Sequence, residues 1–479
     1  MIVLAVLPIV AWVFLVVEIA GILAAIHALM SVRSERGTIA WCLCLVLFPF
    51  ISLPFYFVFG RTKFSGYREA LRNVQEKHEQ EIARIREEIG AYRVDYDADP
   101  GSPEAVLDKL SPFWFTSGNA LEVLVDGQET FDAIFDAIAS AEKYVLVQFY
   151  IVRDDTIGTR LKEHMLSAAE RGVQVYFLYD RYGSQHLGED FIEELKRAGV
   201  QVASFGTGRK LGGRFEINFR NHRKIVIADG RVALIGGHNV GDEYMGESEW
   251  AGPWRDTHVR IEGPGAIDCQ LSFTSDWFWA TEKIPQLNWT PVTGCEDCAP
   301  VLILPSGPTQ DVEMFGLALL TMIISARKRC WIASPYFVPD EAIISALKFA
   351  ALRGVDVRII IPEKKDHWIV YMAAFSFLDE MEKAGVKMLR YQRGFMHQKA
   401  FLIDDHFAGI GTANLDQRSF ALNFEITAIA SGGSMVTDVE RMFDEDLKHC
   451  RPAPGSEFHD RGFLFRVGVR IARLFNPIL

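Results

Sequence analysis

Two stretches of this 479-residue chain carry the same reactive residue types at the same spacing. In each stretch, a His is followed by Lys two residues later, by Asp seven residues later and by Asn seventeen residues later. The two sets are His222, Lys224, Asp229 and Asn239, and His397, Lys399, Asp404 and Asn414. Of the 12 His in the chain, only His222 and His397 have Lys at the second following position. A spacing repeated in this way indicates one site that is built twice.

The His and Lys of each set suit the transfer of a phosphoryl group. Residues i and i+2 of a strand face the same side, so each His and its Lys project together. Two His and two Lys then surround one cavity. There the Lys side chains neutralise phosphate oxygens, one His attacks phosphorus, and the other His protonates the leaving alkoxide.

The elements that must position these residues also occur in two copies. The first copy has a buried strand over 145–152, a helix from 159 to 171, the strand QVYFLYD and a second helix. The second copy repeats this order with strand 330–338, helix 341–353, the strand DVRIIIP and a further helix. Short apolar strands that alternate with helices indicate βαβ units. We therefore predict an α/β fold of two homologous domains with mixed or parallel sheets, packed around a pseudo-two-fold axis.

The first 60 residues are predicted to form a membrane hairpin. Two apolar stretches, 2–30 and 37–60, are each long enough to cross a bilayer. Pro49 and Pro54 would kink the second stretch, so a re-entrant segment is an open alternative. Glu18 is either functional or shielded within the first span. Basic residues are more numerous after the second stretch than in the turn containing Arg33, which predicts a cytoplasmic body.

The composition limits the class of protein. With 49% hydrophobic and 23% charged residues, the chain is not broadly disordered. Its net charge of −12 argues against a nucleic-acid partner, which would require a basic surface. The seven Cys are scattered and indicate no disulfide framework, which favours a reducing compartment for the body. Cys295 and Cys298 form a lone CxxC that lacks a second pair for zinc.

The remaining segments connect or flank the repeats. The charged stretch 67–92 is predicted to be a solvated helix, followed by an acidic linker over 95–103. The predicted organisation is a membrane hairpin, a connecting segment, two repeats and a basic tail. Their bounds are 1–62, 63–118, 119–296, 297–452 and 453–479.

The duplicated motif resembles that of the phospholipase D superfamily, whose two-domain members carry HxKx4D twice. The stretch RNHRKIVIADGRVALIGGHNVGDEY, the N-terminal hairpin and the Ser306-Gly307-Pro308 segment are similar to bacterial cardiolipin synthases. This resemblance implies a phosphatidyltransferase of the bacterial inner membrane that joins two phosphatidylglycerol molecules and releases glycerol. It implies no cofactor and no metal, and it leaves the oligomeric state open.

The resemblance also implies roles for individual residues. His222 is the favoured nucleophile and His397 the acid and base, while Lys224 and Lys399 bind phosphate with help from Asn239 and Asn414. Asp256 and Glu425 lie where the family has an acidic residue that orients a His ring. Asp229 and Asp404 are motif residues. They either take part in catalysis or hold the motif loop by hydrogen bonds.

Two further segments have open interpretations. The stretch 206–213 is interpreted as a loop near the mouth of the site, where Arg209 or Lys210 would contact phosphate. The tail 461–479 places three Arg on one helical face, which suits either a helix on anionic lipid or docking against its own domain. The alternatives to cardiolipin synthesis are phospholipid hydrolysis, transfer to another alcohol, a nuclease of the same superfamily and a non-catalytic scaffold.

Overall fold

The computed structural model describes residues 2–31, 35–60, 64–96, 98–206, 218–247, 252–296, 298–310 and 312–476. Arg33, Arg209 and Lys210 lie outside these residues, so the expectations for the basic turn and for the loop at 206–213 are not addressed.

Each repeat contains a mixed sheet, and corresponding strands follow the same order. The first sheet runs β1-β9-β7-β6-β2-β3-β4, and the second runs β10-β19-β17-β16-β11-β13-β14-β20. In both sheets three neighbouring strands are parallel and the others antiparallel. The first-sheet strands, in that order, span Ala120–Val125, Thr257–Glu262, Val232–Gly236, Ile225–Ala228, Tyr144–Phe149, Gln174–Asp180 and Gln201–Phe205. The second-sheet strands span Val301–Ser306, Asn423–Ser431, Phe407–Gly411, Ala400–Ile403, Arg329–Ala333, Asp356–Pro362, Lys387–Tyr391 and Cys450–Pro452.

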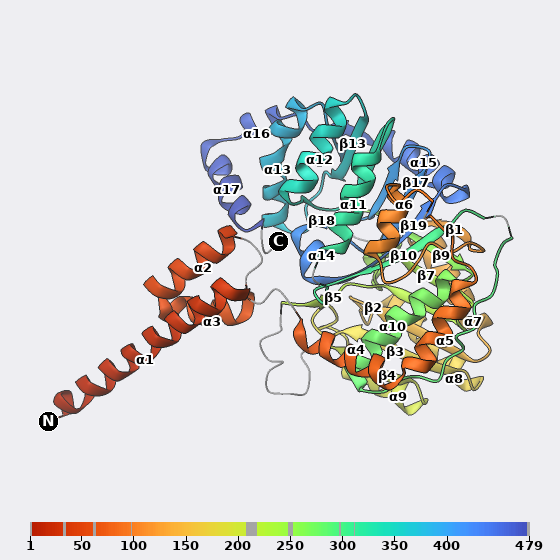
Figure 1. Cartoon of the computed structure of the whole chain (residues 1–479), viewed down its shortest axis with the longest axis horizontal. Coiled ribbons are helices and arrows are strands. Elements are labelled where there is room, and N and C mark those ends of the chain that lie inside the picture. The colour runs from red at the N-terminus through yellow and green to blue at the C-terminus, as the bar shows by residue number, and fades with distance from the viewer. Residues whose placement is uncertain are drawn as a thin grey trace.

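Most helices cover the outer faces of the sheets, whereas two, Gly265–Thr281 and Ser434–Leu447, join the apolar cluster between the inner faces (Figure 1). In β2, Val145 and Val147 face the outer helices, whereas Tyr144 and Leu146 join the cluster between the sheets. Strands buried on both faces are apolar throughout, as these are.

The helices α7 to α10 of the first repeat span Asp126–Ser140, Thr156–Glu170, Glu189–Arg197 and Gly265–Thr281. The helices α11 to α15 of the second span Met314–Ser325, Glu341–Leu352, Trp368–Lys383, Gln417–Ala421 and Ser434–Leu447.

The two repeats exchange short strands next to their motifs. β5 (Arg220–Asn221) comes from the first repeat but pairs with β19 of the second. β15 (Phe395–Met396) comes from the second repeat but pairs with β8 (Trp254–Arg255) of the first. Each catalytic motif is therefore tethered to the opposite repeat, which confirms two similar halves related by pseudo-two-fold symmetry.

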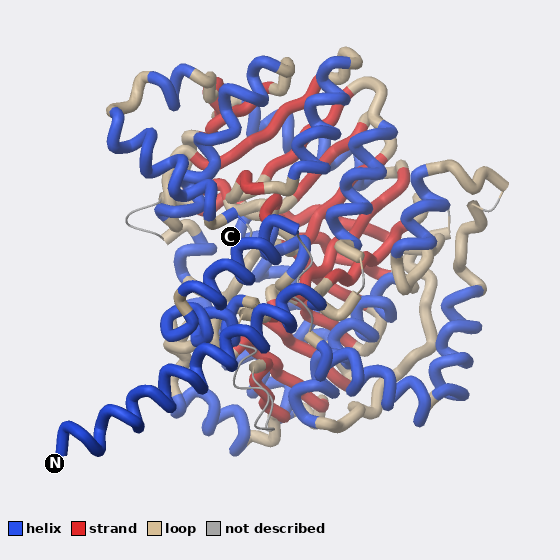
Figure 2. Tube along the Cα trace, turned by 60° about the vertical axis from the view of Figure 1, so that its left-hand side comes forward, coloured by secondary structure: helices blue, strands red, loops and turns tan. Residues whose placement is uncertain are grey.

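The N-terminal segment forms three helices beside the body (Figures 1 and 2). The first is α1 (Ile2–Ser31), in which Val10–Ser31 is long and apolar enough to cross a membrane. The second apolar stretch is divided into α2 (Glu35–Leu47) and α3 (Pro49–Phe59), each shorter than a bilayer crossing.

The division arises at Phe48, whose backbone leaves the helical conformation just before Pro49. α2 runs back along α1, since Cys42 Sγ lies 3.5 Å from the Ala25 carbonyl oxygen. α3 then returns, and Tyr56 reaches His27 at 2.7 Å. The pair α2–α3 therefore has the shape of a re-entrant hairpin.

The sequence predicted one solvated helix for the charged connecting stretch. The structure instead has two helices that pack on the body. It forms α4 (Ser65–Lys77) and α5 (Glu79–Gly90), separated at His78. Tyr67 and Ile89 are buried against the body, because an apolar stripe runs between the charged residues. A short helix, α6 (Pro103–Leu110), follows and is capped by Ser102.

The C-terminal tail docks on the second repeat. It forms α16 (Ser456–His459) and α17 (Phe463–Leu474). Arg473 stacks on Phe377 of this repeat, and Arg470 stacks on Phe458 of α16, within the tail itself. The charged stripe thus faces its own domain, and apolar side chains of α17 face outward.

One cysteine pair differs from the sequence expectation. Cys295 and Cys298 form a disulfide in the segment between the repeats, where no disulfide was predicted. The expectation failed because an odd number of scattered Cys carries no information about which residues the fold brings together.

Candidate active site

A cavity of about 480 Å³ opens between the two repeats and the end of α3. His222 and Tyr150 contribute from the first repeat, Asn414 contributes from the second, and Val58 and Phe59 contribute from α3. The cavity therefore joins the first motif to the apolar N-terminal segment.

The ring of His222 is held by the opposite repeat. Its Nδ1 lies 2.9 Å from Oε2 of Glu425, on β19, and 3.2 Å from the carbonyl oxygen of Thr412. The side chain of Glu425 is fully buried, and its Oε1 accepts a hydrogen bond from Ser419. This arrangement fixes the ring and directs Nε2 away from the carboxylate.

The ring of His397 is held in the same way from the first repeat. Its Nδ1 lies 2.5 Å from Oδ2 of Asp256, which stands between β8 and β9. Lys399 Nζ lies 2.9 Å from the same ring nitrogen. Trp254 and Tyr244 pack around the ring. In both rings Nδ1 is thus occupied, and the hydrogen bonds of the described residues leave each Nε2 available for phosphorus or a proton.

The difference between the two motifs at one position has a steric cause. A Cβ on Gly237 would lie 1.9 Å from Oδ1 of Asp256, so a side chain cannot be accommodated there. The second repeat has Thr412 at this position. Its hydroxyl donates to Oε2 of Glu425 at 2.5 Å. The pairs Gly237–Asp256 and Thr412–Glu425 are two solutions for supporting the same kind of ring.

Both motif lysines are buried and close to the rings. Lys224 Nζ donates to the backbone carbonyl of His222 at 2.6 Å, and Lys399 Nζ donates to that of His397. Burial lowers the pKa of Lys224 to about 7, against the opposing charge of Glu425. Burial likewise lowers the pKa of Lys399 to about 8. An anionic phosphate bound beside these lysines would add a negative charge that favours their ammonium forms.

The His and carboxylate groups are shifted in a complementary way. Burial lowers the pKa of His222, and burial together with the charge of Lys399 lowers that of His397 to about 3. Burial alone would raise the pKa of Asp256, but the charges of Lys399 and His397 lower it. In the same way, burial alone would raise the pKa of Glu425, but the charge of His222 lowers it. The free site therefore holds neutral imidazoles beside ionised carboxylates, which suits a His nucleophile.

The motif aspartates, Asp229 and Asp404, directly follow strands β6 and β16. They therefore lie at the strand ends that are away from the motif histidines. The carboxylate of Asp229 accepts three backbone N–H groups, from Glu142, Lys143 and Tyr144, at 2.8 Å each. The carboxylate of Asp404 accepts the equivalent three, from residues 327 to 329. Both aspartates also have a positive φ of 54° at the turn. Their side chains hold the turn and do not point into the cavity.

The two motif asparagines differ in their surroundings. Asn239 is engaged, since its Oδ1 accepts from the Ile151 backbone at 3.0 Å and its Nδ2 donates to Tyr244 at 2.7 Å. Asn414 lines the cavity, and its buried Oδ1 has no hydrogen-bond partner among the described residues.

The sequence analysis missed a buried carboxylate behind each motif. Asp276, on α10, accepts from Arg223, Asn221, Gln148 and Tyr67 at 2.7–3.0 Å. Asp446, on α15, accepts from Arg255 and Gln398 at 2.7–3.0 Å. Arg223 and Gln398 each follow a motif His, so Asp276 and Asp446 have equivalent places in the two repeats. An alignment of the repeats extended through α10 and α15 would have been the signal that revealed them.

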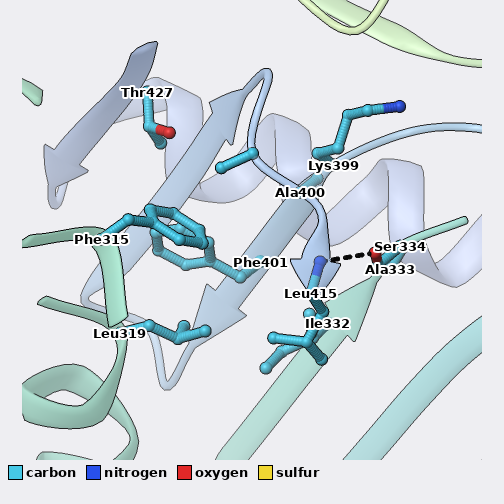
Figure 3. Close-up of a pocket in the computed structure, with 11 residues that line it drawn as sticks. Phe315, Leu319, Ile332, Ala333, Ser334, Lys399, Ala400, Phe401, Leu415 and Thr427 are labelled. Carbon is cyan, nitrogen blue, oxygen red and sulfur yellow. Dashed lines mark hydrogen bonds between the residues drawn. The ribbon is translucent and has the colours of Figure 1, made fainter. Parts of the chain in front are cut away.

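A second, much smaller cavity of about 20 Å³ lies in the core of the second repeat (Figure 3). Apolar side chains such as Phe315, Leu319 and Phe401 line it, and Lys399 extends away from them. This space is a packing void on the core side of the motif strand. Across the described ranges, no group of three His, Cys, Asp or Glu residues is placed to hold a metal ion.

Two pseudo-symmetric repeats that meet at paired His and Lys residues define the phospholipase D superfamily of phosphodiester-cleaving and transferring enzymes. Comparisons with known proteins narrow this class. The family model described as "Cardiolipin synthase, PLD-like domain" matches residues 134–250 and 319–447. A model described as "Phospholipase_D-nuclease N-terminal" matches residues 19–61. The chain belongs to the cardiolipin synthase family of membrane-associated phosphatidyltransferases.

Full-length relatives agree with this assignment, and one solved structure shares the fold. The chain is 44% identical over 465 residues to cardiolipin synthase A of Pseudomonas putida strain F1, covering 97% of each chain. It is 42% identical over 469 residues to cardiolipin synthase A of Pseudomonas aeruginosa strain LESB58, covering 97% of this chain and 95% of the relative. The crystal structure of phosphatidylserine synthase from Haemophilus influenzae Rd KW20 shares the fold. Its TM-score is 0.62 and its identity 15%, over 79% of this chain and 99% of that one.

Proposed function

We propose that this protein joins two phosphatidylglycerol molecules into cardiolipin and releases glycerol. The observation that carries the proposal is the pair of His rings, each held through Nδ1 by a carboxylate of the opposite repeat. Two rings with free Nε2 atoms fit a reaction that needs one nucleophile and one acid or base.

In the first step, Nε2 of His222 attacks the phosphorus of one phosphatidylglycerol. The bond between phosphorus and the terminal glycerol oxygen breaks, and His397 gives that oxygen a proton, which its Nε2 takes up when the anionic phosphate binds and favours the imidazolium form. Glycerol leaves, and a phosphatidyl group remains on His222. The assignment of His222 as the nucleophile is supported by its position on the cavity wall. Lys224, Lys399 and Asn414 stabilise the charge on the phosphate oxygens.

In the second step, the terminal hydroxyl of another phosphatidylglycerol attacks the phosphorus. His397 takes the proton from this hydroxyl, the phosphorus–nitrogen bond to His222 breaks, and cardiolipin leaves. One phosphate ester has replaced another, so no energy source is required. We assign Asp256 and Glu425 the role of orienting the rings, and Asp229 and Asp404 a structural role in the motif turns.

The direct test supplies the purified protein with phosphatidylglycerol alone in detergent micelles. We expect cardiolipin and glycerol in equal amounts, and labelled glycerol should enter phosphatidylglycerol by reversal of the first step. Phosphatidic acid as the main product would indicate a hydrolase instead. His222→Ala and His397→Ala should each lower the rate by about 10²–10⁴-fold or more. Near-normal turnover of either variant would refute the two-motif site.

A metal requirement is tested in the same assay. Chelators should leave turnover largely intact, because two lysines supply the positive charge at the phosphate. Loss of all activity on chelation, restored by one particular divalent ion, would remove the lysine-based mechanism.

We further propose that α1 crosses the bacterial inner membrane, and that α2–α3 enters the bilayer and returns on the side of a cytoplasmic body. The antiparallel course of α2 along α1 and the return of α3 support this topology. It places Glu35, at the start of α2, and Gly60, just after α3, on one side. The sequence next to both is basic, as expected for cytoplasmic segments.

Labelling from one side of the membrane distinguishes the two topologies. With Glu35→Cys, a membrane-impermeant maleimide should react from the same side as with Glu170→Cys on the body. Reaction from opposite sides would establish two full spans. A reporter fused after Leu479 should be cytoplasmic, and a periplasmic signal would reverse the orientation.

A further inference from the structure

Two arginines lie on the wall of the active-site cavity in addition to the motif residues. Arg220 is on β5, two positions before His222, and Arg418 is on α14 of the second repeat. Both line the cavity that His222 also lines. Alternation along an extended segment places Arg220 and His222 on the same face.

Among the described residues, each guanidinium group contacts a neutral side chain. Arg418 donates through NH1 to Oδ1 of Asn218 at 3.0 Å and through NH2 to the Asn218 carbonyl at 2.8 Å. The guanidinium carbon of Arg220 lies 3.9 Å from the ring centroid of Tyr182. Planar guanidinium groups that are fixed in this way are well suited to bidentate binding of phosphate.

The charge on this wall is predominantly positive. Among the described residues, no carboxylate lies within 4.0 Å of the Arg220 guanidinium. Asp416 is on the same wall, but its carboxylate caps α14 by accepting the Ser419 amide at 2.7 Å. An anion in this cavity therefore lies beside two arginines and His222.

The proposed reaction requires a second anion site. The donor phosphate occupies the His and Lys residues, and the leaving glycerol carries no charge. The acceptor phosphatidylglycerol enters along the route by which glycerol leaves, but it brings its own phosphodiester. That phosphate must lie next to the reacting centre while the donor phosphatidyl group is still on the histidine.

We propose that Arg220 and Arg418 bind the phosphate of the acceptor phosphatidylglycerol. This inference rests on the function proposed above and adds the residues that select the acceptor. It follows that the arginines act mainly in the second step, and only when the acceptor carries a phosphate. Free glycerol, as an uncharged acceptor, does not need them.

The test compares two reactions of the same phosphatidyl intermediate. Cardiolipin formation uses the charged acceptor, whereas incorporation of labelled glycerol into phosphatidylglycerol uses the uncharged one. In Arg220→Gln and Arg418→Gln we expect cardiolipin formation to fall about 10–100-fold, the effect of losing a hydrogen bond to a charged group. Glycerol exchange should fall far less, so the ratio of the two rates changes by about the same factor.

Two controls complete the experiment. Arg220→Lys keeps the positive charge and should recover part of the cardiolipin rate. Arg160 is an exposed residue of α8 whose guanidinium stacks on Phe135 of α7, and it does not line the cavity. Arg160→Gln should leave the ratio unchanged.

Two results would overturn the inference. Equal losses of both reactions would assign the arginines to the donor phosphate or to folding, and unchanged cardiolipin formation would exclude them from the site. The parent protein separates this inference from the proposed function. If the parent makes no cardiolipin from phosphatidylglycerol, the proposed function itself fails.

Discussion

His397 and Asp256 belong to different repeats, yet their Nδ1 and Oδ2 atoms lie 2.5 Å apart. The equivalent pair, His222 and Glu425, spans the interface in the opposite direction at 2.9 Å. Each repeat thus provides a histidine for its own motif and a carboxylate for the other motif. Neither repeat holds a complete site, and the geometry of each ring depends on how the two halves pack.

The first prediction concerns the orienting carboxylate. Asp256→Asn keeps the shape of the side chain but removes the charge that supports His397. We expect the rate of cardiolipin formation to fall about 10²–10⁴-fold, the usual contribution of a positioned acid or base. The thermal unfolding temperature should change little. A variant with normal turnover would show that His397 does not need this carboxylate.

The second prediction concerns the close approach at Gly237. Gly237→Ala would place a methyl group 1.9 Å from the Asp256 carboxylate, so the carboxylate must move. We expect a stability loss of about 1–3 kcal/mol, as for other overpacked sites, together with reduced turnover. Gly462→Ala is the control, because a Cβ there meets no atom within 4 Å. Equal effects of both substitutions on denaturant unfolding would contradict the steric explanation.

The third prediction concerns pH. Burial lowers the pKa values of Lys224 and Lys399 to about 7 and about 8, so these lysines lose their protons as pH rises through that range. Because only the ammonium forms stabilise phosphate, kcat/KM for phosphatidylglycerol should fall between pH 7 and 9. In Lys224→Arg, which stays charged, only the loss of the Lys399 proton at about pH 8 remains, so any remaining activity should persist to higher pH. An alkaline limb near pH 10 would show that the lysines are not shifted in the free enzyme.

The same shifts have a consequence for stability. A lysine whose pKa is lower in the folded state binds fewer protons there than in the unfolded chain. The cost of burying Lys224 is therefore full below pH 7 and disappears as pH rises toward 10.5. Lys224→Met should stabilise the protein more at pH 7 than at pH 9.5, measured by denaturant unfolding. A gain that does not depend on pH would contradict the burial argument.

The fifth prediction concerns the outward face of α17. Leu464 and Leu474 of α17 are 83% and 78% exposed. In Figure 1, α17 lies on the side of the body that carries α1–α3. We expect this face to lie in the membrane interface. An environment-sensitive dye on Leu464→Cys should report an apolar surrounding in liposomes, and one on Glu170→Cys should not. The signal is taken relative to the labelled parent, which has its own free cysteines. Equal spectra at both sites would show that α17 stays in water.

The sequence predicted the paired His and Lys site because the spacing is local and occurs twice. The sequence also indicated Asp256 and Glu425, but it did not indicate that each supports the histidine ring of the opposite repeat. That exchange depends on β5 and β15, two-residue strands whose pairing is decided by the packing of the repeats. No local pattern encodes such a contact.

Two other differences have the same kind of cause. The helical pattern at the C-terminus predicted an arginine stripe correctly, but Arg473 stacks on Phe377 of the second repeat and Arg470 on Phe458 of α16. The second apolar stretch is long enough to cross a bilayer, yet a break at Phe48 and contacts with α1 divide it. In both cases, tertiary contacts outweighed a correct local pattern.

Val58 and Phe59 of α3 form part of the wall of the catalytic cavity. With α3 in the bilayer, as proposed above, a lipid would pass from the membrane to His222 without dissolving in water, and its encounter with the enzyme would be a collision in two dimensions. The rate should then follow the mole fraction of phosphatidylglycerol in the membrane rather than its bulk concentration. Dilution of the substrate with an inert lipid would slow the enzyme, whereas dilution of the whole vesicle suspension would not.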